Sequence, residues 1–562
     1  MTGPVSLPGF VPWPGELVQR YRVAGYWAGM TIGAMFDGSV RAYADRTALV
    51  ASGRRLTYAE VGVLTRRLAC HLLRLGINTY DRVILQLPNL VELVLAYFAC
   101  QKVGAIPMTC LPAYRHAEVG RFAEFIEAVA YFIPREFRGF DYLAMARELR
   151  DKNPGLKHVL VAGARGTADA ISIDELLRTP VEEAWERALE ECRPDPLMPA
   201  VLLLSGGTTG TPKVIPRTHE DFLCLSRSSG AGTGVSGESV LLLTLPLTHI
   251  LPLAAPGLQG AFMVGAKVVL APSPDPAVAF PLIEGERVTF TALVPPALIG
   301  WINSPNRAKH DLSSLRAVPT GGMKMTAELA KRAHQVFGDA VMQEYGMSEG
   351  FVTSTRPGDP LDWIFETQGR PVSPGDEFRI VDEGGRELPA GEVGELVVRG
   401  PYTIRGYYRA PDHNRVAFTD DGFYRTGDMV RLHPSGNIVI EGRKKDMINR
   451  GGEHISAEEV ESLILSHPKV QNTAVVAMPD PLLGERACAY AILRPGETLT
   501  LEELHRFLLE EKRVAKLKLP ERLLVVAELP LTPVGKISKP ALRRDIEKRV
   551  EGERAGAAVK RG

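Results

Sequence analysis

Ten residues, SGGTTGTPKV at 205–214, combine the groups that bind phosphate. The glycines let backbone N–H groups approach an anion closely, the serine and threonine hydroxyls add donors, and Lys213 adds a positive charge. A Walker A loop needs a serine or threonine directly after its lysine, and Pro212 would interrupt the helix that must follow. A P-loop NTPase is therefore disfavoured, and a plain glycine- and threonine-rich turn is the alternative for this stretch alone.

Two stretches further along the chain place carboxylates where nucleotide chemistry could use them. QEYGMSEG at 343–350 combines an aromatic ring, two glycines and Glu349, and a carboxylate beside a triphosphate can hold Mg²⁺. GFYRTGD at 422–428 places Asp428 after a tight turn, where its carboxylate can accept hydrogen bonds from ribose hydroxyls. Taken alone, Asp428 is more simply explained as a solvated charge.

Two glycine-bearing segments nearer the C-terminus carry the remaining polar residues of interest. GRKKDMINRGGEHIS at 442–456 is polar and is a candidate hinge. LPLTPVGKISK at 529–539 places Lys536 behind a glycine in an exposed loop. A single lysine there is also more simply explained as a solvated charge. The role of these stretches therefore depends on the secondary-structure elements that position them.

Between residues 40 and 350 the chain alternates short apolar runs with helical patterns. LVELVLAYFACQKVG, which follows RVILQLP at 82–88, has the pattern of a helix. Apolar runs separated by helices are typical of parallel sheets covered on both faces, and ligands bind beyond the carboxyl ends of such strands. We therefore predict an α/β fold, with strands at RVILQLP, KHVLVAG, AVLLLS, VLLLTLP, KVVLAP and VTFTALVP.

The pattern of predicted secondary structure changes from about residue 375. EFRIVD, GELVVRG and GNIVIEG are short strands with Gly and Asp-Gly turns, which predict a β-rich subdomain over 375–440. Two helices with capping signals at Ser456 and Thr500, together with strands at NTAVVAM, ACAYAIL and RLLVVAEL, predict a compact α+β domain. The predicted organisation is an N-terminal domain at 1–442, a hinge at 443–446, a C-terminal domain at 447–552 and a disordered tail at 553–562.

Composition limits the remaining classes of function. The 562 residues carry 66 basic and 66 acidic side chains, so no global field favours a nucleic acid or an acidic membrane. No apolar stretch reaches the roughly 18 residues of a membrane span, and the N-terminus lacks the features of a signal peptide. The six cysteines are scattered, with no C-x-x-C pair, so a disulfide framework or metal site is not expected and the cytoplasm is the predicted compartment.

In their order and spacing, the five stretches resemble the adenylate-forming superfamily, which includes acyl-CoA synthetases, peptide-synthetase adenylation domains and luciferases. The resemblance spans almost the whole chain and is strongest to stand-alone aryl acid–AMP ligases, such as those for 2,3-dihydroxybenzoate and salicylate. It implies that the anion at the loop is the triphosphate of ATP. The shared sequences are WPGELVQRYRVAGYW, SGGTTGTPKVIPRTH, FPLIE, TALVPPA, TQGRP, RGPYTIRGYY and INRGGEHISAEEVE.

The resemblance implies a reaction in which an aryl carboxylate attacks the α-phosphorus of ATP and pyrophosphate leaves. Lys536 is expected to bridge the two anions, Glu349 to hold Mg²⁺ and Tyr345 to stack on adenine. Asp428 and Arg443 are expected to bind the ribose. The other ATP-binding residues that the resemblance implies are Ser205, Gly206, Gly207, Thr208, Thr209, Gly210, Lys213, Gly321, Gly322 and Gly346.

The resemblance also implies a second step, in which a phosphopantetheine thiol, usually on an aryl carrier protein, takes the acyl group in nonribosomal peptide, siderophore or related biosynthesis. A mobile C-terminal domain is expected to rotate between the steps about Lys445, two residues after Arg443. Free coenzyme A is the alternative acceptor, which would make the protein an aryl-CoA ligase of aromatic catabolism. A non-catalytic homologue that holds ATP or acyl-adenylate is a remote alternative.

The acid pocket departs from that of the ligases it resembles. His249, in LPLTHILPLAAPG at 245–257, matches a family histidine beside the carboxylate and thiol channel and is expected to assist catalysis. Dihydroxybenzoate ligases read the ring hydroxyls with an asparagine and a serine where this chain has Ile250 and Ala255, whose side chains form no hydrogen bonds. Unless a neighbouring loop restores those bonds, we expect another acid, such as 3-hydroxyanthranilate or 3-hydroxypicolinate, with salicylate a weaker substrate. The predicted pocket comprises His249, Ile250, Ala255, Gly322, Met323, Ser348 and Val352.

Overall fold

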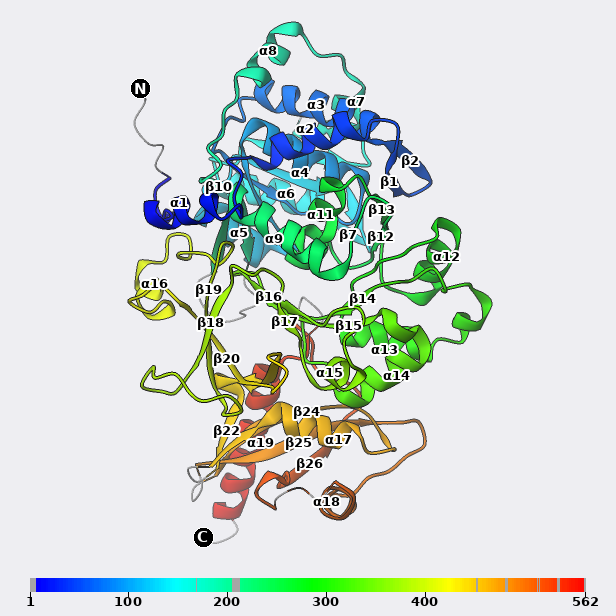
Figure 1. Cartoon of the computed structure of the whole chain (residues 1–562), viewed down its shortest axis with the longest axis vertical. Coiled ribbons are helices and arrows are strands. Elements are labelled where there is room, and N and C mark those ends of the chain that lie inside the picture. The colour runs from blue at the N-terminus through cyan, green and yellow to red at the C-terminus, as the bar shows by residue number, and fades with distance from the viewer. Residues whose placement is uncertain are drawn as a thin grey trace. The chain divides into compact units, whose positions relative to one another are not determined.

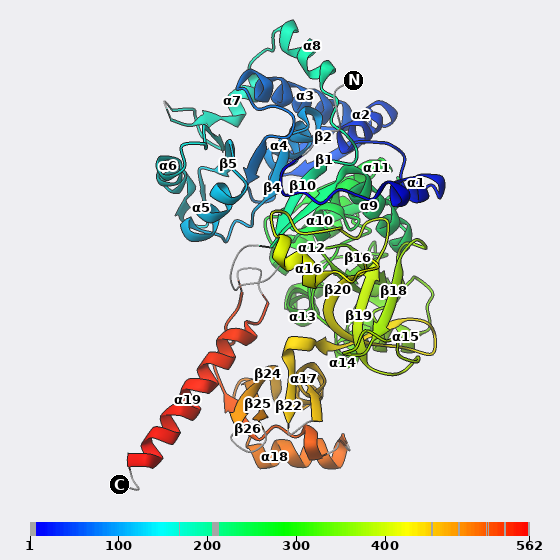
Figure 2. The same ribbon diagram turned by 90° about the vertical axis from the view of Figure 1, so that its left-hand side faces the viewer.

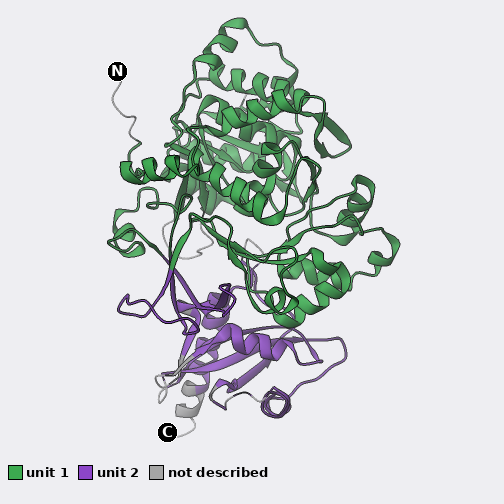
Figure 3. Cartoon of the chain, viewed as in Figure 1, with its two compact units in different colours: residues 1–378, 398–424 green, residues 379–397, 425–562 purple. Residues whose placement is uncertain are grey.

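The structure is a computed structural model, and it describes residues 7–167, 169–204, 213–450, 453–480, 484–512, 514, 516–532 and 536–559. The chain divides into two compact units (Figure 3). Unit 1 comprises residues 1–378 and 398–424, and unit 2 comprises residues 379–397 and 425–562. Each unit has buried hydrophobic clusters of its own.

Two sheets with mostly parallel neighbours form the first part of unit 1 (Figure 1). The edge strands β11 and β2 run antiparallel to their neighbours, and the other pairs are parallel. The larger sheet has the order β11 (Val214–Thr218), β10 (Pro199–Leu204), β4 (Ile106–Thr109), β3 (Arg82–Leu85), β5 (Ala130–Pro134), β8 (His158–Ala162) and β9 (Ile171–Ser172). The smaller has the order β12 (Val240–Leu243), β13 (Lys267–Leu270), β1 (Thr47–Ala51) and β2 (Arg54–Thr57).

Helices cover both faces of the larger sheet, which explains why its central strands carry apolar residues at consecutive positions. Ile84 packs in a cluster with side chains of α5 (His116–Phe125) and α6 (Tyr142–Lys152). Helix α4 (Val91–Val103) packs against β3 and β4. Figure 2 shows the helices α4, α5 and α6 around the sheet. The neighbours of Ile84 along the strand, Val83 and Leu85, are also fully buried. Because successive side chains point to opposite faces, a strand buried on both faces cannot alternate polar and apolar residues.

A third sheet in unit 1 carries the QEYGMSEG stretch. Its order is β14 (Val318–Thr320), β15 (Val341–Met347), β16 (Phe351–Ser354) and β17 (Arg370–Pro371), with β14 parallel to β15 and the rest antiparallel. VTFTALVP, predicted as a strand, forms only isolated parallel bridges, from Phe290 to Leu241 and Ala317 and from Leu293 to Thr320. It remains extended between β12 and β14, and helix α13 begins directly after it at Pro295.

The other elements of unit 1 include further helices and one small hairpin, β6 (Glu136–Phe137) with β7 (Phe140–Asp141). The helix α3 starts with a capping box of Thr57 and Glu60, and α9 starts with one of Thr218 and Asp221. The helices are α1 (Gly15–Val23), α2 (Ile32–Ala42), α3 (Tyr58–Arg74), α7 (Ile173–Arg178), α8 (Glu183–Glu191), α9 (His219–Thr233), α10 (Ile250–Ala254), α11 (Gly257–Met263), α12 (Pro276–Glu286), α13 (Pro295–Asn303), α14 (Ala327–Phe337), α15 (Leu361–Glu366) and α16 (Pro411–Ala417).

Unit 2 contains most of one sheet and all of another. The first has the order β18 (Glu377–Val381), β19 (Gly394–Arg399), β20 (Tyr424–Leu432) and β21 (Ile438–Arg443). The second has the order β23 (Glu453–Ser456), β22 (Met447–Arg450), β25 (Gly484–Leu493) and β24 (Val470–Asp480), and β26 (Arg522–Val525) pairs with β25. The short turn η3 (Lys444–Asp446) joins the two sheets, and the helices are α17 (Ala457–Leu465), α18 (Leu501–Arg506) and α19 (Lys539–Val559).

The predicted α/β class, with parallel sheets, a β-rich part and a small C-terminal α+β part, is confirmed. Ser456 caps α17 by accepting from the backbone of Glu459, and Thr500 caps α18 in the same way. Helix α19 continues to Val559, where the sequence predicts a disordered tail from 553. The boundary at 442 and the hinge stay predictions. Within the described part of the chain, no helix has the length and apolarity that crossing a membrane requires.

Candidate active site

The predicted phosphate-binding loop follows β10 in the sequence, and its residues 205–212 fall outside the described part of the chain. Lys213, which ends the loop, is described and exposed. Its ammonium nitrogen lies 5.6 Å from the centre of the Tyr407 ring, within the range of a cation–π contact. The structure therefore places the end of the predicted loop beside Tyr407.

Glu349 is held by a chain of tyrosine hydroxyls. Its Oε1 accepts a hydrogen bond of 2.7 Å from Tyr407, whose hydroxyl oxygen lies 2.9 Å from that of Tyr424. Burial raises the pKa of Tyr407 far above its ordinary value, and Glu349 and Tyr424 raise it further, so this hydroxyl stays protonated and donates. Glu349 is only 8% exposed, and Lys213 and Glu349 thus contact the same tyrosine.

The backbone around Glu349 is fixed on both sides. Gly350 has a φ of +101°, and a Cβ there would lie 1.7 Å from the Tyr402 carbonyl oxygen, so only glycine fits. The buried Arg217, paired with Asp221 at 2.8 Å, donates to the carbonyls of Ser348 and Tyr402 at 2.9 Å each. These contacts determine the direction in which the Glu349 side chain leaves the backbone.

A glycine pair lies beside the β15 strand that carries Tyr345. Thr320 pairs in parallel with Gln343, which sets Gly321 opposite Glu344. A Cβ at Gly321 would lie 2.9 Å from the Glu344 carbonyl oxygen, so a larger residue would separate the strands. Gly322 follows with a φ of +79°. The predicted adenine-binding backbone is therefore assembled against the strand of Tyr345.

The acid-pocket segment forms the start of helix α10. His249 is its N-cap, and its Nδ1 accepts from the backbone of Leu251 at 3.4 Å. Ile250 and Ala255 are both buried. Val352, also buried, pairs with Gly346 across β15 and β16, while Met323 is half-buried.

In unit 2, the structure brings three predicted residues together. Asp428 and Arg443 are directly opposite in the β20–β21 ladder and form an ion pair. Asp428 is 3% exposed, and its backbone N–H donates to Thr426 at 3.0 Å. The pKa of Lys536 is lowered, first by desolvation of its ammonium and then by Arg443, while Asp428 acts in the opposite direction. Lys536 is thus in electrostatic reach of the predicted ribose-binding pair.

The segment that carries Lys536 is anchored on both sides. Leu531 and Ile537, on either side of it in the sequence, form an antiparallel bridge, and the Lys536 backbone N–H donates to the Thr532 hydroxyl at 3.1 Å. After it, the half-buried Lys539 forms an ion pair of 2.8 Å with Glu461 of α17, and both side chains are about 15% exposed. Desolvation lowers the pKa of Lys539, but the nearby carboxylates outweigh it and raise the value above the ordinary one. Lys539 is therefore charged and fixes the start of α19.

The predicted pivot Lys445 lies in η3, between the two sheets of unit 2. The next residue, Asp446, forms an ion pair of 2.9 Å with Arg543 of α19. The turn is thus linked to the same helix that follows Lys536.

Sequence reasoning did not identify Tyr407, Tyr424, Arg217 or Glu344. Tyr407 stands in RGPYTIRGYY and Tyr424 in GFYRTGD, two stretches that the sequence analysis quoted for other reasons. Arg217 stands in SGGTTGTPKVIPRTH. Their roles are not readable from spacing, since Glu349 and Tyr407 are 58 positions apart.

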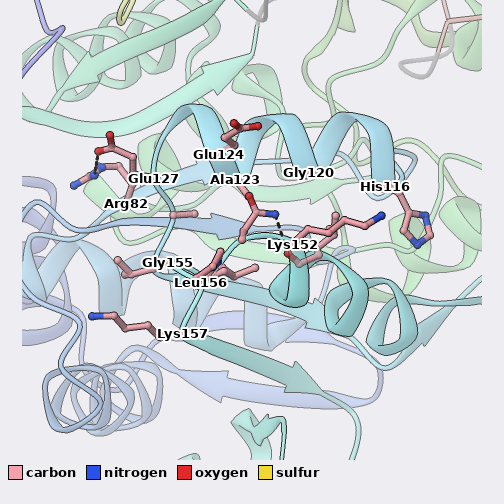
Figure 4. A pocket seen from close by; sticks show the side chains of 15 residues that line it. Arg82, His116, Gly120, Ala123, Glu124, Glu127, Lys152, Gly155, Leu156 and Lys157 are labelled. Atoms are coloured by element: carbon pink, nitrogen blue, oxygen red, sulfur yellow. Dashed lines mark hydrogen bonds and ion pairs between the residues drawn. The ribbon is translucent and has the colours of Figure 1, made fainter.

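A surface hollow of about 750 Å³ lies elsewhere in unit 1, between α5 and the segment that follows α6 (Figure 4). His116, Glu124 and Lys152 line it, and Arg82 pairs with Glu127 at its rim. None of the predicted site residues lines it. Among the described residues, no group of three or more His, Cys, Asp or Glu side chains is arranged to hold a metal ion.

Comparison with known proteins decides the family. The model of the family described as "AMP-binding enzyme" matches residues 36–408, and the model described as "AMP-binding enzyme C-terminal domain" matches residues 459–536. The chain belongs to the AMP-binding enzyme family. The first matched region contains the Lys213–Tyr407–Glu349 cluster of unit 1, and the second contains Lys536 of unit 2. The two matches confirm the predicted resemblance.

Three relatives of this AMP-binding enzyme are similar over nearly their whole length. The 2,3-dihydroxybenzoate-AMP ligase of Bacillus subtilis (strain 168) is 45% identical over 544 residues, covering 97% of this chain and 99% of that protein. A salicylyl-CoA synthase / salicylate adenylyltransferase of Streptomyces sp is 47% identical over 537 residues, covering 95% and 97%. The Mycobacterium smegmatis MbtA apo structure has a TM-score of 0.73 and 42% identity, covering 95% and 98%.

Proposed function

We propose that this AMP-binding enzyme activates an aryl carboxylic acid with ATP and transfers the aryl group to the phosphopantetheine thiol of an aryl carrier protein. The observation that carries this proposal is the similarity, over nearly the full chain, to proteins named as 2,3-dihydroxybenzoate-AMP ligase and salicylate adenylyltransferase. The motif residues required for the chemistry are present. The pathway is nonribosomal peptide, siderophore or related biosynthesis.

The first step joins two anions. A carboxylate oxygen attacks the α-phosphorus of ATP, the bond to the β-phosphate oxygen breaks, and pyrophosphate leaves with its electrons. Because negative charge accumulates at the α-phosphate, the protein must supply cations and donors directed at that group. Lys536 supplies the cation, and its lowered pKa reflects partial desolvation that strengthens its interaction with an anion.

Unit 1 binds the nucleotide. Lys213 and the preceding loop hold the β- and γ-phosphates, and Tyr345 and the Gly321–Gly322 backbone hold adenine. Glu349 fits a magnesium site, because Mg²⁺ is commonly bound by one or two carboxylates together with substrate phosphates. When bound, Mg²⁺ neutralises phosphate charge. Tyr407 keeps the Glu349 carboxylate oriented by donating to one of its oxygens.

Unit 2 holds the ribose through Asp428 and Arg443. In the second step the thiol sulfur attacks the acyl carbon, the bond to the phosphate oxygen of AMP breaks, and the thiol proton leaves to solvent. Between the two steps the C-terminal domain, which comprises residues 447–552, rotates about Lys445. The rotation removes Lys536 from the reacting groups and presents a second face of that domain to them. His249 lies at the thiol channel.

The acid is not 2,3-dihydroxybenzoate, because the buried Ile250 and Ala255 cannot pair with ring hydroxyls. Each unpaired buried polar group costs about 1–3 kcal/mol. ATP–pyrophosphate exchange over a panel of aryl acids tests this, with 2,3-dihydroxybenzoate expected to rank low. The double variant Ile250→Asn, Ala255→Ser is expected to raise its rank. The highest kcat/KM for 2,3-dihydroxybenzoate in the parent protein would contradict the pocket assignment.

A second candidate function is an aryl-CoA ligase, which the name of the Streptomyces relative favours. The two functions differ only in the thiol acceptor. Incubation with a labelled aryl acid, ATP and either a pantetheinylated carrier protein or coenzyme A separates them. Label on the carrier protein supports the proposal, and label on coenzyme A alone supports the second function. No exchange with any aryl acid would contradict both.

A further inference from the structure

One buried carboxyl group near the proposed acid pocket has an atom without a partner inside the protein. Glu344, in β15, is 7% exposed, and its Oε2 is buried without a hydrogen-bond partner among the described residues. Most buried polar atoms in native proteins are paired, and an unpaired carboxyl oxygen is among the most unfavourable exceptions. Burial alone raises the pKa of Glu344, to about 8, with no neighbouring charge contributing.

The neighbouring residue Gln343 shows that the strand can satisfy a polar side chain. The Gln343 amide donates to the carbonyls of Ile364 and Phe365 and accepts from Gln368. Its side chain points to the opposite face of the strand from that of Glu344. The unpaired oxygen of Glu344 therefore belongs to the face of β15 opposite to Gln343, whose own side chain is paired.

The face of the sheet that carries Glu344 also carries Val352 of β16, one of the residues of the proposed acid pocket. Glu344 pairs with Ser354 and Gly346 pairs with Val352 across the antiparallel ladder, so all four residues share one face. A Cβ built at Gly321 would lie 3.4 Å from the Glu344 Cβ, so the glycine pair also borders this face. Tyr345, proposed to hold adenine, lies on the opposite face.

We propose that Glu344 determines the substrate, by accepting a hydrogen bond from an amino or hydroxyl group on the ring of the aryl acid. The inference rests on the proposed function of the site. A ring donor supplies the partner that the protein does not. The substrate carboxylate is directed away from Glu344, because that carboxyl group is buried and has no neighbouring cation to stabilise another negative charge. An aryl acid bearing only apolar substituents would leave the carboxyl unpaired.

Exchange of pyrophosphate into ATP tests this with benzoate and with its methyl, hydroxy and amino derivatives at each ring position. At one ring position or more, the donor-substituted acid is expected to exceed the methyl analogue in kcat/KM by about 10- to 100-fold, the range expected when the alternative leaves a buried polar group unpaired. In Glu344→Val this ratio is expected to fall to about one, with kcat/KM for the methyl analogue raised.

Two further variants keep the test decisive. Glu344→Gln retains an accepting oxygen and is expected to keep part of the ratio, and Glu344→Met fills the site if Glu344→Val does not fold. Ser354→Ala is the matched control, because its hydroxyl is satisfied by the Thr355 carbonyl at 2.9 Å, and it is expected to leave the ratio unchanged.

Three results would overturn the inference. One is a parent protein that treats methyl and donor-substituted acids alike at every position. Another is a ratio that persists in Glu344→Val or Glu344→Met. The third is a change in KM for ATP without a change in the ratio, which would assign Glu344 to the nucleotide. Absence of exchange with every aryl acid would instead contradict the proposed function.

Discussion

The surroundings of Glu349 in unit 1 and of Lys536 in unit 2 are built in different ways. Glu349 is buried, its backbone is held by Arg217 and Gly350, and its carboxylate is held by Tyr407. Lys536 is exposed, and its backbone is anchored by Thr532 and by the half-buried Lys539–Glu461 ion pair that follows. One proposed site residue, Glu349, is positioned by direct contacts to its side chain, and the other, Lys536, by contacts that anchor its segment.

The difference has a physical reason. A group that binds a ligand throughout the reaction benefits from a fixed orientation, because less entropy is lost on binding. A group proposed to act in one step only must be free to leave its ligand afterwards. We therefore expect substitutions near Glu349 to affect nucleotide binding, and substitutions around Lys536 to separate the two half-reactions.

The largest effect is expected when the Lys539–Glu461 ion pair, which anchors the segment of Lys536, loses one of its two partners. Lys539→Met leaves Glu461 buried without its cation, which is expected to lower the stability of unit 2 by about 3–5 kcal/mol. Thermal unfolding monitors the loss. The double variant Lys539→Met, Glu461→Leu is expected to recover most of it, since no unpaired charge remains. Equal unfolding temperatures for the single variant and the parent would show that the pair is no anchor.

Removal of the cation itself should separate the two steps. Lys536→Ala is expected to lower the rate of adenylation about 10²–10³-fold, because a contact to developing charge is lost. Transfer from pre-formed aryl-AMP to the thiol is expected to continue at the parent rate. Lys548→Ala, an exposed lysine of α19, serves as the control. Equal losses in both steps would contradict the role given to Lys536.

The opposite result, in which the first step is retained and the second is lost, is expected for a substitution at the proposed pivot, Lys445. Lys445→Pro restricts φ to about −65° and hinders rotation of the C-terminal domain. Adenylation is expected to persist, and thioester formation is expected to fall about 10²-fold, as for a misplaced reacting group. Single-turnover measurements of each step check this. If both steps fall together, Lys445 does not act as a pivot.

A smaller effect is expected on the unit 1 side of the comparison. Tyr407→Phe removes the donor to Glu349 but keeps the ring beside Lys213. A hydrogen bond to a charged group contributes about 1.5–3 kcal/mol, so KM for ATP with Mg²⁺ is expected to rise roughly tenfold or more while KM for the aryl acid is unchanged. A change confined to the aryl acid would show that this cluster serves the other substrate.

The smallest effect concerns pH. Burial raises the pKa of Glu344 to about 8, so ionisation is harder in the folded than in the unfolded state. Its contribution to stability is fully present below the ordinary pKa of 4.5 and is lost as pH rises through about 8. The unfolding temperature of Glu344→Gln, minus that of the parent, is expected to rise by about 2–4 °C between pH 5.5 and pH 9. A difference independent of pH would place Glu344 in contact with solvent.

Much of this protein followed from the sequence by itself. Local patterns were sufficient for the strands and helices of the α/β fold, for the caps at Ser456 and Thr500, and for the family, because hydrophobic periodicity and motif order are properties of short segments. VTFTALVP was a partial exception: its apolar pattern predicted a strand, but Phe290 and Leu293 meet their neighbours only at isolated bridges.

Only the tertiary structure decided which side chains support the motif residues. Tyr407 donates to Glu349 from 58 positions away, and Lys539 pairs with Glu461 of another helix. The same holds for Glu344, which looks like an ordinary polar residue of a strand until its face, its burial and its missing partner are known. The free energy of a buried polar group depends on what surrounds it in space, and the order of residues along the chain does not contain that information directly.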